Sequence, residues 1–467
     1  MNVFIFHRDL RIHDNTALIK LHEYGDVTPI FIFTPEQIDK KTYFSNNSVQ
    51  FMVESLHELS SDIKQNGGHL NMFHGHTMDV LKSLNGHKKI NSISYNIDYT
   101  PYAKKRDDEI RKFCKNNDIK CIECEDYPLF DILGGQTKKA NGTPYLVFTP
   151  FKNHCLTLPV RHIDKFKSWN FTKRLQENKS SIDEKAIDKY YKENKDINIH
   201  GGRKNGLSIL GRINDFNNYD TQRDKMTYKT TFLSAHNHFG TISIREVYGA
   251  VDKLSGKTLL SELIWRDFYL NITHEFPHIL KGQISGKNLS YKKEYDNIKW
   301  SYNKKLFSAW CEGKTGFPIV DACMRQLNTT GFMHNRGRMI CASFLTKDLH
   351  IDWRLGEQYF ATQLVDYDAA MNNNGWTWTT GNGTDASKWF RIFNPWLQSK
   401  KFDHDAVYIK KWVTELSDVS AKDIHNWFKE KVREDVRDEV KIKYPDPIID
   451  HDVEKKITLK LYKEALS

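Results

Sequence analysis

Residues 372–378 read NNNGWTW, in which three neutral amides precede a glycine and two tryptophans that are two positions apart. Amide side chains donate and accept hydrogen bonds without carrying charge, so they suit the polar edge of a ring-shaped ligand. Indole rings offer large flat faces on which such a ring stacks. The stretch therefore raises the question of which flat ligand it binds, and neighbouring residues must answer it.

Two carboxylates precede this stretch. Asp366 and Asp368 lie two positions apart in the segment DYDAA, just before the amides. Such a pair suits acid–base chemistry, or it binds an arginine or a ligand hydroxyl. The alternative is a polar loop that caps a helix.

The segment SELIWRDFYLNI (261–272) is helical by pattern. Positions i, i+3, i+4 and i+7 share one helix face, which here carries a carboxylate, an indole, a guanidinium and a phenol. This face suits a base and a phosphate, and the alternative is a helix that packs on a neighbour with one Glu–Arg pair. The four residues are Glu262, Trp265, Arg266 and Tyr269.

The segment FMHNRGRMICASFL (332–345) is also helical by pattern. Asn335, Arg338 and Met339 share one face, where an amide can bond a base or flavin edge and methionine makes a soft contact with a flat ring. Arg336 points elsewhere, toward a phosphate in this interpretation. The alternative is an ordinary amphipathic helix.

Hydroxyl groups gather in the segment TTFLS (230–234). Thr230, Thr231 and Ser234 supply them, and a helix that begins here would add backbone N–H groups. That combination can cradle a diphosphate without a glycine-rich loop.

Two other motifs resemble a zinc site and a phosphate loop, but each lacks a feature that its pattern requires. HEFPH (274–278) matches the zinc pattern HExxH, which needs both histidines on one helix face, yet Pro277 breaks the helix. GKTG (313–316) resembles a phosphate loop, but Ser308 stands where the pattern requires glycine. We therefore expect neither a metal site nor a phosphate loop here.

The first 130 residues alternate short apolar runs with amphipathic segments. This alternation predicts a doubly wound parallel sheet, and no GxGxxG follows the first strand to indicate a dinucleotide site. The predicted strands are 2–6, 28–33, 70–73, 91–96 and 119–123, and the predicted helices are 49–63 and 102–114.

The remaining chain divides into a polar connector and a helical region. We predict an α/β domain over 1–130, a lysine-rich connector over 131–205 and a larger all-helical domain over 206–467. Ten of the 11 tryptophans, all but Trp169, follow residue 260, so we expect the unusual chemistry in the helical domain.

Charge and composition limit the class of protein. The 467 residues include 69 basic and 59 acidic side chains, for a net charge of +10, which favours a polyanionic partner such as nucleic acid. No run of 18 apolar residues exists, so we expect no membrane span. The seven scattered cysteines are typical of a reducing compartment, so we expect a soluble intracellular protein, and a monomer.

Together these stretches resemble the photolyase/cryptochrome flavoprotein family, and the resemblance runs through nearly the whole chain. It is most specific in the tryptophan-rich segments. The segments that carry it are FHRDLRIHDNTAL (6–18), YDTQR (219–223) with TTFLS, ELIWRDFY (262–269), the block 310–339, and NNNGWTW with GTDASKWFRIFNP (383–395).

The resemblance implies an N-terminal α/β domain and a helical domain that binds FAD. Arg338 would pair with Asp366 beside the flavin, and Asn372 would face flavin N5, where a neutral amide adds no second negative charge. The implied FAD-binding residues are Tyr219, Thr230, Thr231, Phe232, Leu233, Ser234, Arg338, Asp366, Tyr367, Asp368 and Asn372.

The resemblance also divides the tryptophans between two tasks. Trp376, Trp353 and Trp300 match an electron-hopping chain from flavin to surface, while Trp265 and Trp378 match walls that enclose a flipped-out DNA lesion. We expect Trp376 and Trp378 to point in opposite directions on an extended backbone. The implied DNA-binding residues are Arg223, Glu262, Trp265, Arg266, Tyr269, Asn335, Arg336, Met339, Trp378, Arg391 and Gln398.

Asn335 and Met339 match the family members that repair cyclobutane pyrimidine dimers, whereas (6-4) enzymes carry a histidine in place of this asparagine. Glu262 stands where the family uses a carboxyl group to bond the dimer. The resemblance thus implies light-dependent dimer repair by electron transfer from excited reduced FAD, with a cryptochrome-type blue-light photoreceptor as the alternative.

A second, light-harvesting chromophore is also implied for the N-terminal domain. Folate-binding members carry an Asn-Glu pair where this chain has Tyr102 and Ala103, which disfavours folate. A deazaflavin, a flavin or no second chromophore all stay open.

Overall fold

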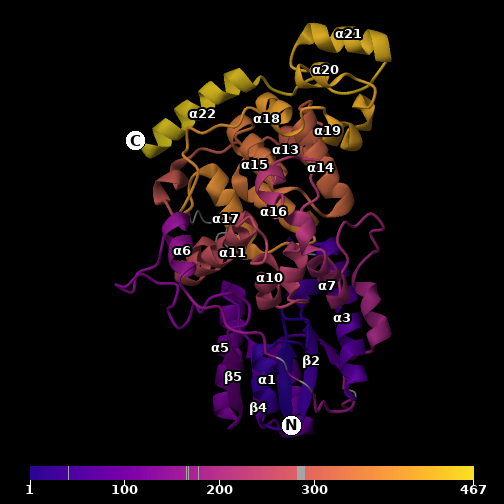
Figure 1. Cartoon of the computed structure of the whole chain (residues 1–467), viewed down its shortest axis with the longest axis vertical. Helices are drawn as coiled ribbons and strands as arrows, with labels where there is room; N and C mark the ends of the chain where they lie inside the picture. The colour runs from indigo at the N-terminus through magenta and orange to yellow at the C-terminus, as the bar shows by residue number, and fades with distance from the viewer. Residues whose placement is uncertain (40–41, 165, 167, 177, 281–289) are drawn as a thin grey trace.

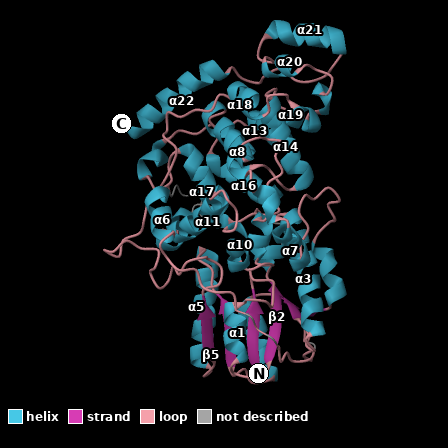
Figure 2. Cartoon of the chain, in the orientation of Figure 1, coloured by secondary structure: helices cyan, strands magenta, loops and turns pink. Residues whose placement is uncertain are grey.

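The computed structural model describes residues 1–39, 42–164, 166, 168–176, 178–280 and 290–467. All strands of the sheet gather at the end of the molecule that holds the N-terminus, and helices make up most of the rest (Figures 1 and 2). The chain therefore has the α/β-plus-helical architecture that the sequence predicts.

The N-terminal sheet has six strands in the order β5-β4-β1-β2-β3-β6. The first five strands in sequence are parallel, and β6 pairs antiparallel with β3 at the edge. The strands are β1 (Asn2–Phe6), β2 (Val27–Phe33), β3 (Asn71–His74), β4 (Ser92–Asn96), β5 (Lys120–Cys124) and β6 (Ser181–Ile182).

Helices cover both faces of this sheet, as the residues of β1 show. Phe4 and Phe6 pack into one hydrophobic cluster with residues of α1 and α3, whereas Val3 and Ile5 pack into another with residues of α4 and α5. Because successive side chains of a strand point to opposite faces, the central strands are apolar on both sides. The helices are α1 (Thr16–His22), α2 (Pro35–Ile38), α3 (Asn46–Gln65), α4 (Thr77–His87) and α5 (Pro101–Asn116).

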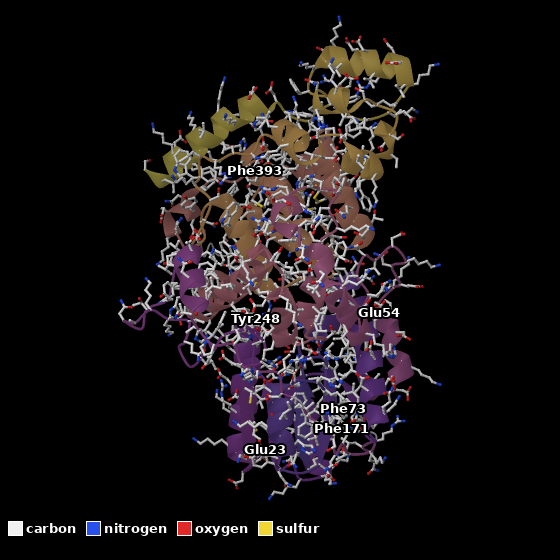
Figure 3. The ribbon with its side chains drawn as sticks, viewed as in Figure 1. Glu23, Glu54, Phe73, Phe171, Tyr248 and Phe393 are labelled. Carbon is white, nitrogen blue, oxygen red and sulfur yellow. The ribbon has the colours of Figure 1, made fainter. Side chains whose placement is uncertain are left out.

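The five predicted strands are confirmed, but the sequence did not predict β6. This strand has two residues and lies inside the polar segment after residue 160, so it offers no hydrophobic pattern. The same segment returns along the sheet region, where Phe171, which is labelled in Figure 3, forms a bridge with Val27. The predicted connector 131–205 also includes α6 (Phe148–Cys155), which packs on α11.

The helical region surrounds a large cluster of buried side chains that includes Trp310, Trp353, Trp376 and Trp427. No helix among the described residues is both long and apolar enough to cross a membrane. The helices and helical turns are α7 (Arg203–Gly211), α8 (Tyr219–Gln222), α9 (Ser234–Phe239), α10 (Ile244–Val251), α11 (Thr258–Glu275), α13 (Lys304–Glu312), α14 (Pro318–Thr330), α15 (Asn335–Ser343), η4 (Phe344–Asp348, a π-helical turn), α16 (Trp353–Gln363), α17 (Ala369–Thr380), α18 (Pro395–Phe402), α19 (Val407–Trp412), α20 (Ala421–His425), α21 (Glu430–Val440) and α22 (His451–Leu466).

Buried ion pairs join the two regions. Arg245 at the start of α10 bonds Asp14 and Asp126 of the N-terminal region, each at 2.7 Å. Arg11 pairs with the same Asp126 and donates to the Gly240 carbonyl at 3.1 Å. Every charge in this network has an opposite partner, which buried charges require.

Candidate functional site

One cavity of about 570 Å³ lies in the helical region, between α11, α15 and α17. It brings together 21 of the 25 site residues that the sequence predicts. Those residues are Tyr219, Arg223, Thr230, Thr231, Phe232, Leu233, Ser234, Glu262, Trp265, Arg266, Tyr269, Asn335, Arg336, Arg338, Met339, Asp366, Tyr367, Asp368, Asn372, Trp376 and Trp378.

The hydroxyl segment turns sharply on one wall of this cavity. Phe232 has a positive φ of 56°, which is rare for a bulky residue, and the next helix, α9, begins two residues later at Ser234. The Phe232 ring packs edge-to-face on Phe332, 4.9 Å between centroids, which offsets the cost of the strained backbone. Such strain is typical of ligand sites, because the fold must hold the loop in one shape.

Arg338 and Asp366 form the ion pair that the family resemblance implies. The Arg338 guanidinium lies 2.9 Å from the Asp366 carboxylate, and its Nε donates to the Met333 carbonyl at 2.9 Å. The arginine comes from α15 and the aspartate from the segment before α17. The pair therefore fixes these two elements relative to each other at the cavity wall.

The stretch NNNGWTW lies on helix α17, so the expectation of an extended backbone is wrong. Asp368 caps this helix, accepting bonds from the N–H groups of Ala370 (2.9 Å) and Met371 (3.1 Å). The helix-capping alternative for this aspartate is therefore correct. On a helix, Trp376 and Trp378 still point about 200° apart, because each residue turns the helix by about 100°. Trp376 is 2% exposed, and both tryptophans line the cavity.

Asn372 is held by a residue outside the cavity. Its Nδ2 donates to the backbone carbonyl of Glu357 at 3.0 Å and to the Glu357 carboxylate at 2.8 Å. The Tyr43 hydroxyl donates to the same buried carboxylate at 3.0 Å. With its nitrogen engaged in this way, the Asn372 amide has its oxygen left for a ligand.

The helix α11 presents a carboxylate and aromatic rings to the cavity. Glu262 pairs with Arg223, and burial raises the pKa of the Glu262 carboxyl although Arg223 opposes the shift. The Trp265 ring stacks on Phe148 of α6, 3.6 Å between centroids and 10° between planes. Phe148 therefore supports one face of the indole and orients it.

Two arginines in the wall already have protein partners. Arg336 pairs with Asp224 at 2.8 Å, and its buried Nε has no hydrogen-bond partner among the described residues. Arg266 donates to the Tyr127 carbonyl at 2.8 Å and stacks on the Tyr127 ring. These contacts were not foreseen from the sequence, and contact of either arginine with DNA stays a prediction.

On α15, the Asn335 Nδ2 lies 3.7 Å from the Met339 sulfur, as expected for residues one helical turn apart. Both line the cavity beside Arg338. The face that the helical spacing predicts is thus present in the structure.

Four predicted residues lie outside the cavity lining: Trp353, Trp300, Arg391 and Gln398. Trp376 packs against Gly356, one turn after Trp353 in α16, and the backbone beside Trp300 is bridged to Ile351. The elements that carry Trp376, Trp353 and Trp300 are therefore in contact, while electron transfer along these three indoles stays a prediction. Trp376 also contacts Trp310, 6.2 Å between ring centroids.

Sequence reasoning missed several residues of the wall and its support. Tyr127, Asn237 and His238 line the cavity, and Glu357 holds Asn372. None of these residues lies on a helix face or motif that the sequence analysis recognised. Their roles depend on contacts with residues that are distant in the sequence. HNH (236–238) was the only local signal, because its polar side chains follow the hydroxyl segment directly.

The residues present fit FAD. The Asn237 side-chain oxygen lies buried in the wall with no partner among the described residues, so it is free to accept a bond from a ligand. Hydroxyl groups at 230–234 suit a diphosphate, while Arg338, Asp366 and Asn372 suit the polar edge of a ring system. Apolar residues such as Phe360 and Leu364 complete the lining.

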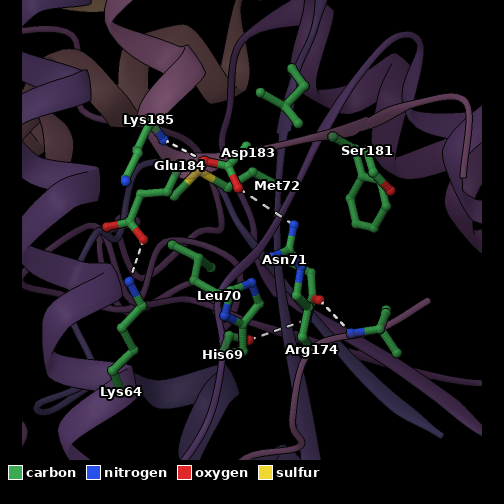
Figure 4. A pocket seen from close by; sticks show the side chains of 13 residues that line it. Lys64, His69, Leu70, Asn71, Met72, Arg174, Ser181, Asp183, Glu184 and Lys185 are labelled. Atoms are coloured by element: carbon green, nitrogen blue, oxygen red, sulfur yellow. Dashed lines mark hydrogen bonds and ion pairs between the residues drawn. The ribbon is translucent and has the colours of Figure 1, made fainter. Parts of the chain in front are cut away.

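A second cavity of about 310 Å³ lies at the edge of the sheet, beside β3 and β6 (Figure 4). Lys64 pairs with Glu184 there, and Arg174 lies 3.5 Å from Asp183. No predicted site residue lines it. Its charges are used within the protein, so the first cavity is the candidate site.

Comparison with known proteins identifies the family. Residues 2–167 match the family model described as DNA photolyase, and residues 259–464 match that of the FAD binding domain of DNA photolyase. The chain is 34% identical to deoxyribodipyrimidine photo-lyase of Buchnera aphidicola subsp. Baizongia pistaciae, over 100% of this chain and 98% of the relative. This chain belongs to the DNA photolyase family.

Solved structures of this photolyase family share the fold. The photolyase of Sulfolobus tokodaii, solved with two FAD molecules, superposes with a TM-score of 0.87 at 38% identity and covers 99% of this chain and 100% of its own. A cryptochrome of Synechocystis gives a TM-score of 0.86 at 24% identity, with 99% of each chain covered, which shows the fold alone. Most residues that line the cavity lie within 259–464, the range that matches the FAD binding domain.

Proposed function

We propose that this protein is a light-dependent deoxyribodipyrimidine photolyase, which splits cyclobutane pyrimidine dimers in DNA. The observation that carries the proposal is that one cavity collects both the predicted FAD-binding residues and the predicted lesion-binding residues. Curated relatives named deoxyribodipyrimidine photo-lyase match the chain over nearly its full length, which supports the same function.

FAD is held in this proposal by the segment 230–234 at its diphosphate and by Arg338, Asp366 and Asn372 at its ring. When bound and reduced, FAD supplies an electron to the lesion on excitation by light. Glu357 orients the Asn372 amide so that a neutral group faces the ring. The protein thus contributes position and a fixed polar environment.

The lesion is held by residues of α11, α15 and α17. Trp265 and Trp378 provide flat faces for the two pyrimidine rings, and Phe148 keeps the Trp265 ring in place. Glu262 hydrogen-bonds a carbonyl of the dimer, and its raised pKa favours the protonated, donating form. Asn335 and Met339 contact the rings from the adjoining helix.

Duplex DNA is bound around the cavity mouth through phosphate contacts, for which Arg391 and exposed lysines are the candidates. Trp376, Trp353 and Trp300 form the route by which FAD is reduced. Residues 1–130 form the domain that carries any second chromophore. The relative from Sulfolobus tokodaii was solved with two FAD molecules, which supports a flavin there and keeps folate disfavoured.

The test is a repair assay on an oligonucleotide with one cis-syn thymine dimer, split between blue light and darkness. Reduced protein should restore the undamaged strand only in the light, as measured by chromatography. A photoreceptor, the alternative function, would bind FAD but leave the dimer intact under light. A second oligonucleotide with a (6-4) lesion, which should stay unrepaired, is the matched substrate control.

A further inference from the structure

The first turn of α17 is fixed by a residue from the other region of the molecule. Arg8 is the second residue after β1, whereas Asp368 caps α17 some 360 residues later. The Arg8 guanidinium pairs with the Asp368 carboxylate and also contacts the His238 Nδ1 at 2.9 Å. Its other nitrogen lies 3.0 Å from Asp98, at the end of β4.

The Arg8–Asp98 contact lies at the carboxyl ends of the neighbouring strands β1 and β4. The strand order places β2 and β3 on one side of β1 and β4 and β5 on the other, so the connections reverse direction between β1 and β4. In open α/β sheets, ligands usually bind in the crevice at such a reversal, at the carboxyl ends of the strands. Here Arg8 and Asp98 pair just beyond the ends of β1 and β4, and Arg8 reaches Asp368 in the helical region.

A ring sandwich makes this contact rigid. The Tyr127 ring lies between the guanidinium groups of Arg8 and Arg266, with 3.9 Å from each to the ring centroid. The Tyr127 hydroxyl donates to Asp368 at 2.6 Å. Tyr127, His238, Arg266 and Asp368 all line the cavity, so Arg8 lies directly behind its wall.

We propose that Arg8 is a positioning residue for FAD, through which the N-terminal region fixes Asp368 and thereby the Asn372 and Trp376 face of α17. The inference rests on the proposed FAD site. It implies that the N-terminal region has a second task besides holding a chromophore: it completes the catalytic cavity. The isolated helical region should therefore bind FAD poorly.

Electrostatics supports this role. Burial alone would raise the pKa of the Asp368 carboxyl, but Arg8 and a hydrogen bond from His238 hold it below its ordinary value. Burial and the adjacent Arg8 lower the pKa of His238, so Arg8 is the principal counter-charge of Asp368 at neutral pH. Arg266 is the other cation near this carboxylate, and Tyr127 the neutral donor. Without Arg8, a buried carboxylate would lack its main partner, which is strongly unfavourable.

The test measures FAD affinity of the full chain in the dark, by flavin fluorescence during reconstitution of the apoprotein. Arg8→Met should weaken binding by about tenfold or more at neutral pH. Because removal of Arg8 raises the pKa of Asp368, lowering the pH should protonate this carboxylate in the variant and shrink the loss. Arg8→Lys keeps the positive charge, so its FAD affinity should lie between those of the wild type and Arg8→Met.

Asp368→Asn supplies the decisive comparison, because asparagine still caps a helix. In that background Arg8→Met should change the affinity by less than about twofold. Arg11→Met is the matched control, because Arg11 is an arginine between the two regions that contacts no cavity residue. In this variant Asp126 still has its ion pair with Arg245. The variant should bind FAD as the wild type does.

Equal affinity in Arg8→Met and wild type, or the same loss with and without Asp368, would overturn the role. If Arg8→Met does not fold, the Arg8→Lys series with and without Asp368→Asn decides in the same way. Failure of the wild type to bind FAD at all would instead refute the proposed function.

Discussion

Three polar groups of the cavity wall are each held by another side chain of the protein. Glu357 holds Asn372, Arg338 holds Asp366 and Arg8 holds Asp368. A group that is held before the ligand arrives needs little reorganisation when charge moves, and this preorganisation is the main contribution of a protein to such chemistry. Single substitutions should therefore act through orientation and protonation state.

Glu262 should give repair a pH dependence. Because burial raises its pKa, the carboxyl keeps its proton to higher pH than usual, and the donor is lost as the pH rises through that pKa. The single-turnover repair rate should fall accordingly. Glu262→Gln, which always donates, should flatten the profile, while Glu262→Ala should lower the rate by about tenfold or more at every pH. An unchanged profile in Glu262→Gln would exclude this role.

Trp376 should affect reduction of the cofactor but not repair. Trp376→Phe should slow light-driven reduction of bound FAD by at least about a hundredfold, because phenylalanine does not supply an electron readily. The same variant, reduced chemically beforehand, should repair dimers at close to the wild-type rate. The two rates are measured by absorbance and by chromatography. Loss of repair in the chemically reduced variant would show that Trp376 acts on the lesion instead.

Elements differ in how far their sequence determines them. The five parallel strands and the helices of α11, α15 and α3 follow from apolar periodicity, so they could be predicted from local sequence. β6 could not, because two residues carry no pattern. NNNGWTW was expected to be extended because such a backbone points residues i and i+2 in opposite directions, but the Asp368 cap and burial of Trp376 make it helical.

The residues of the candidate site also divide into those that local sequence predicts and those that it does not. Twenty-one predicted residues meet in one cavity because each lies on a motif that is recognisable locally. Arg8, Tyr127 and Glu357 were missed because their roles depend on partners far away in the sequence, and no local spacing encodes those contacts. Arg391 and Gln398 lie outside the cavity lining, so only binding data can test them.

The π-helical turn η4 connects the core to the loop that carries Arg391. Lys347 of this turn is buried and donates to the Arg391 carbonyl at 2.8 Å, and burial lowers its pKa to about 8. The unfolded chain then binds more protons between about pH 8 and the ordinary lysine pKa, so stability should rise with pH across that window.

Lys347→Met should remove this slope. Urea unfolding at several pH values measures the free energy of unfolding, and the difference between wild type and variant isolates Lys347 from the other lysines. Below about pH 8 the variant should also have a larger free energy of unfolding, because it buries no charge. Loss of the hydrogen bond to the Arg391 carbonyl should offset part of this gain. Parallel pH profiles for the two proteins would show that Lys347 is neutral or hydrated in the fold.

At the scale of the whole molecule, two regions are joined by buried arginines and carry a surplus of positive charge. Arg8 and Arg245 each pair with aspartate across the boundary between the sheet region and the helices, and Arg11 donates to the Gly240 carbonyl across it. The cavity lining itself has four arginines and four acidic residues, so the net charge of +10 lies elsewhere on the surface. That surplus should attract DNA from a distance.

Binding of damaged DNA should therefore weaken with salt. Arg391→Gln should lower the slope of log affinity against log salt by about 0.9, the value for one lost phosphate contact. Lys115→Gln is the matched control, because Lys115 is exposed on α5 of the sheet region. Fluorescence anisotropy with a labelled duplex gives both slopes. An equal decrease for the two variants would show that Arg391 contributes only general charge.

The most direct measurement is the fluorescence lifetime of reduced FAD bound to the protein, with and without a dimer-containing oligonucleotide. If the cavity places the lesion beside FAD, the damaged strand should shorten the lifetime and an undamaged strand of the same sequence should not. Trp265→Ala should weaken this response by disrupting the lesion site while FAD stays bound. An identical lifetime with damaged and undamaged DNA, at saturating binding, would contradict a shared site for cofactor and lesion.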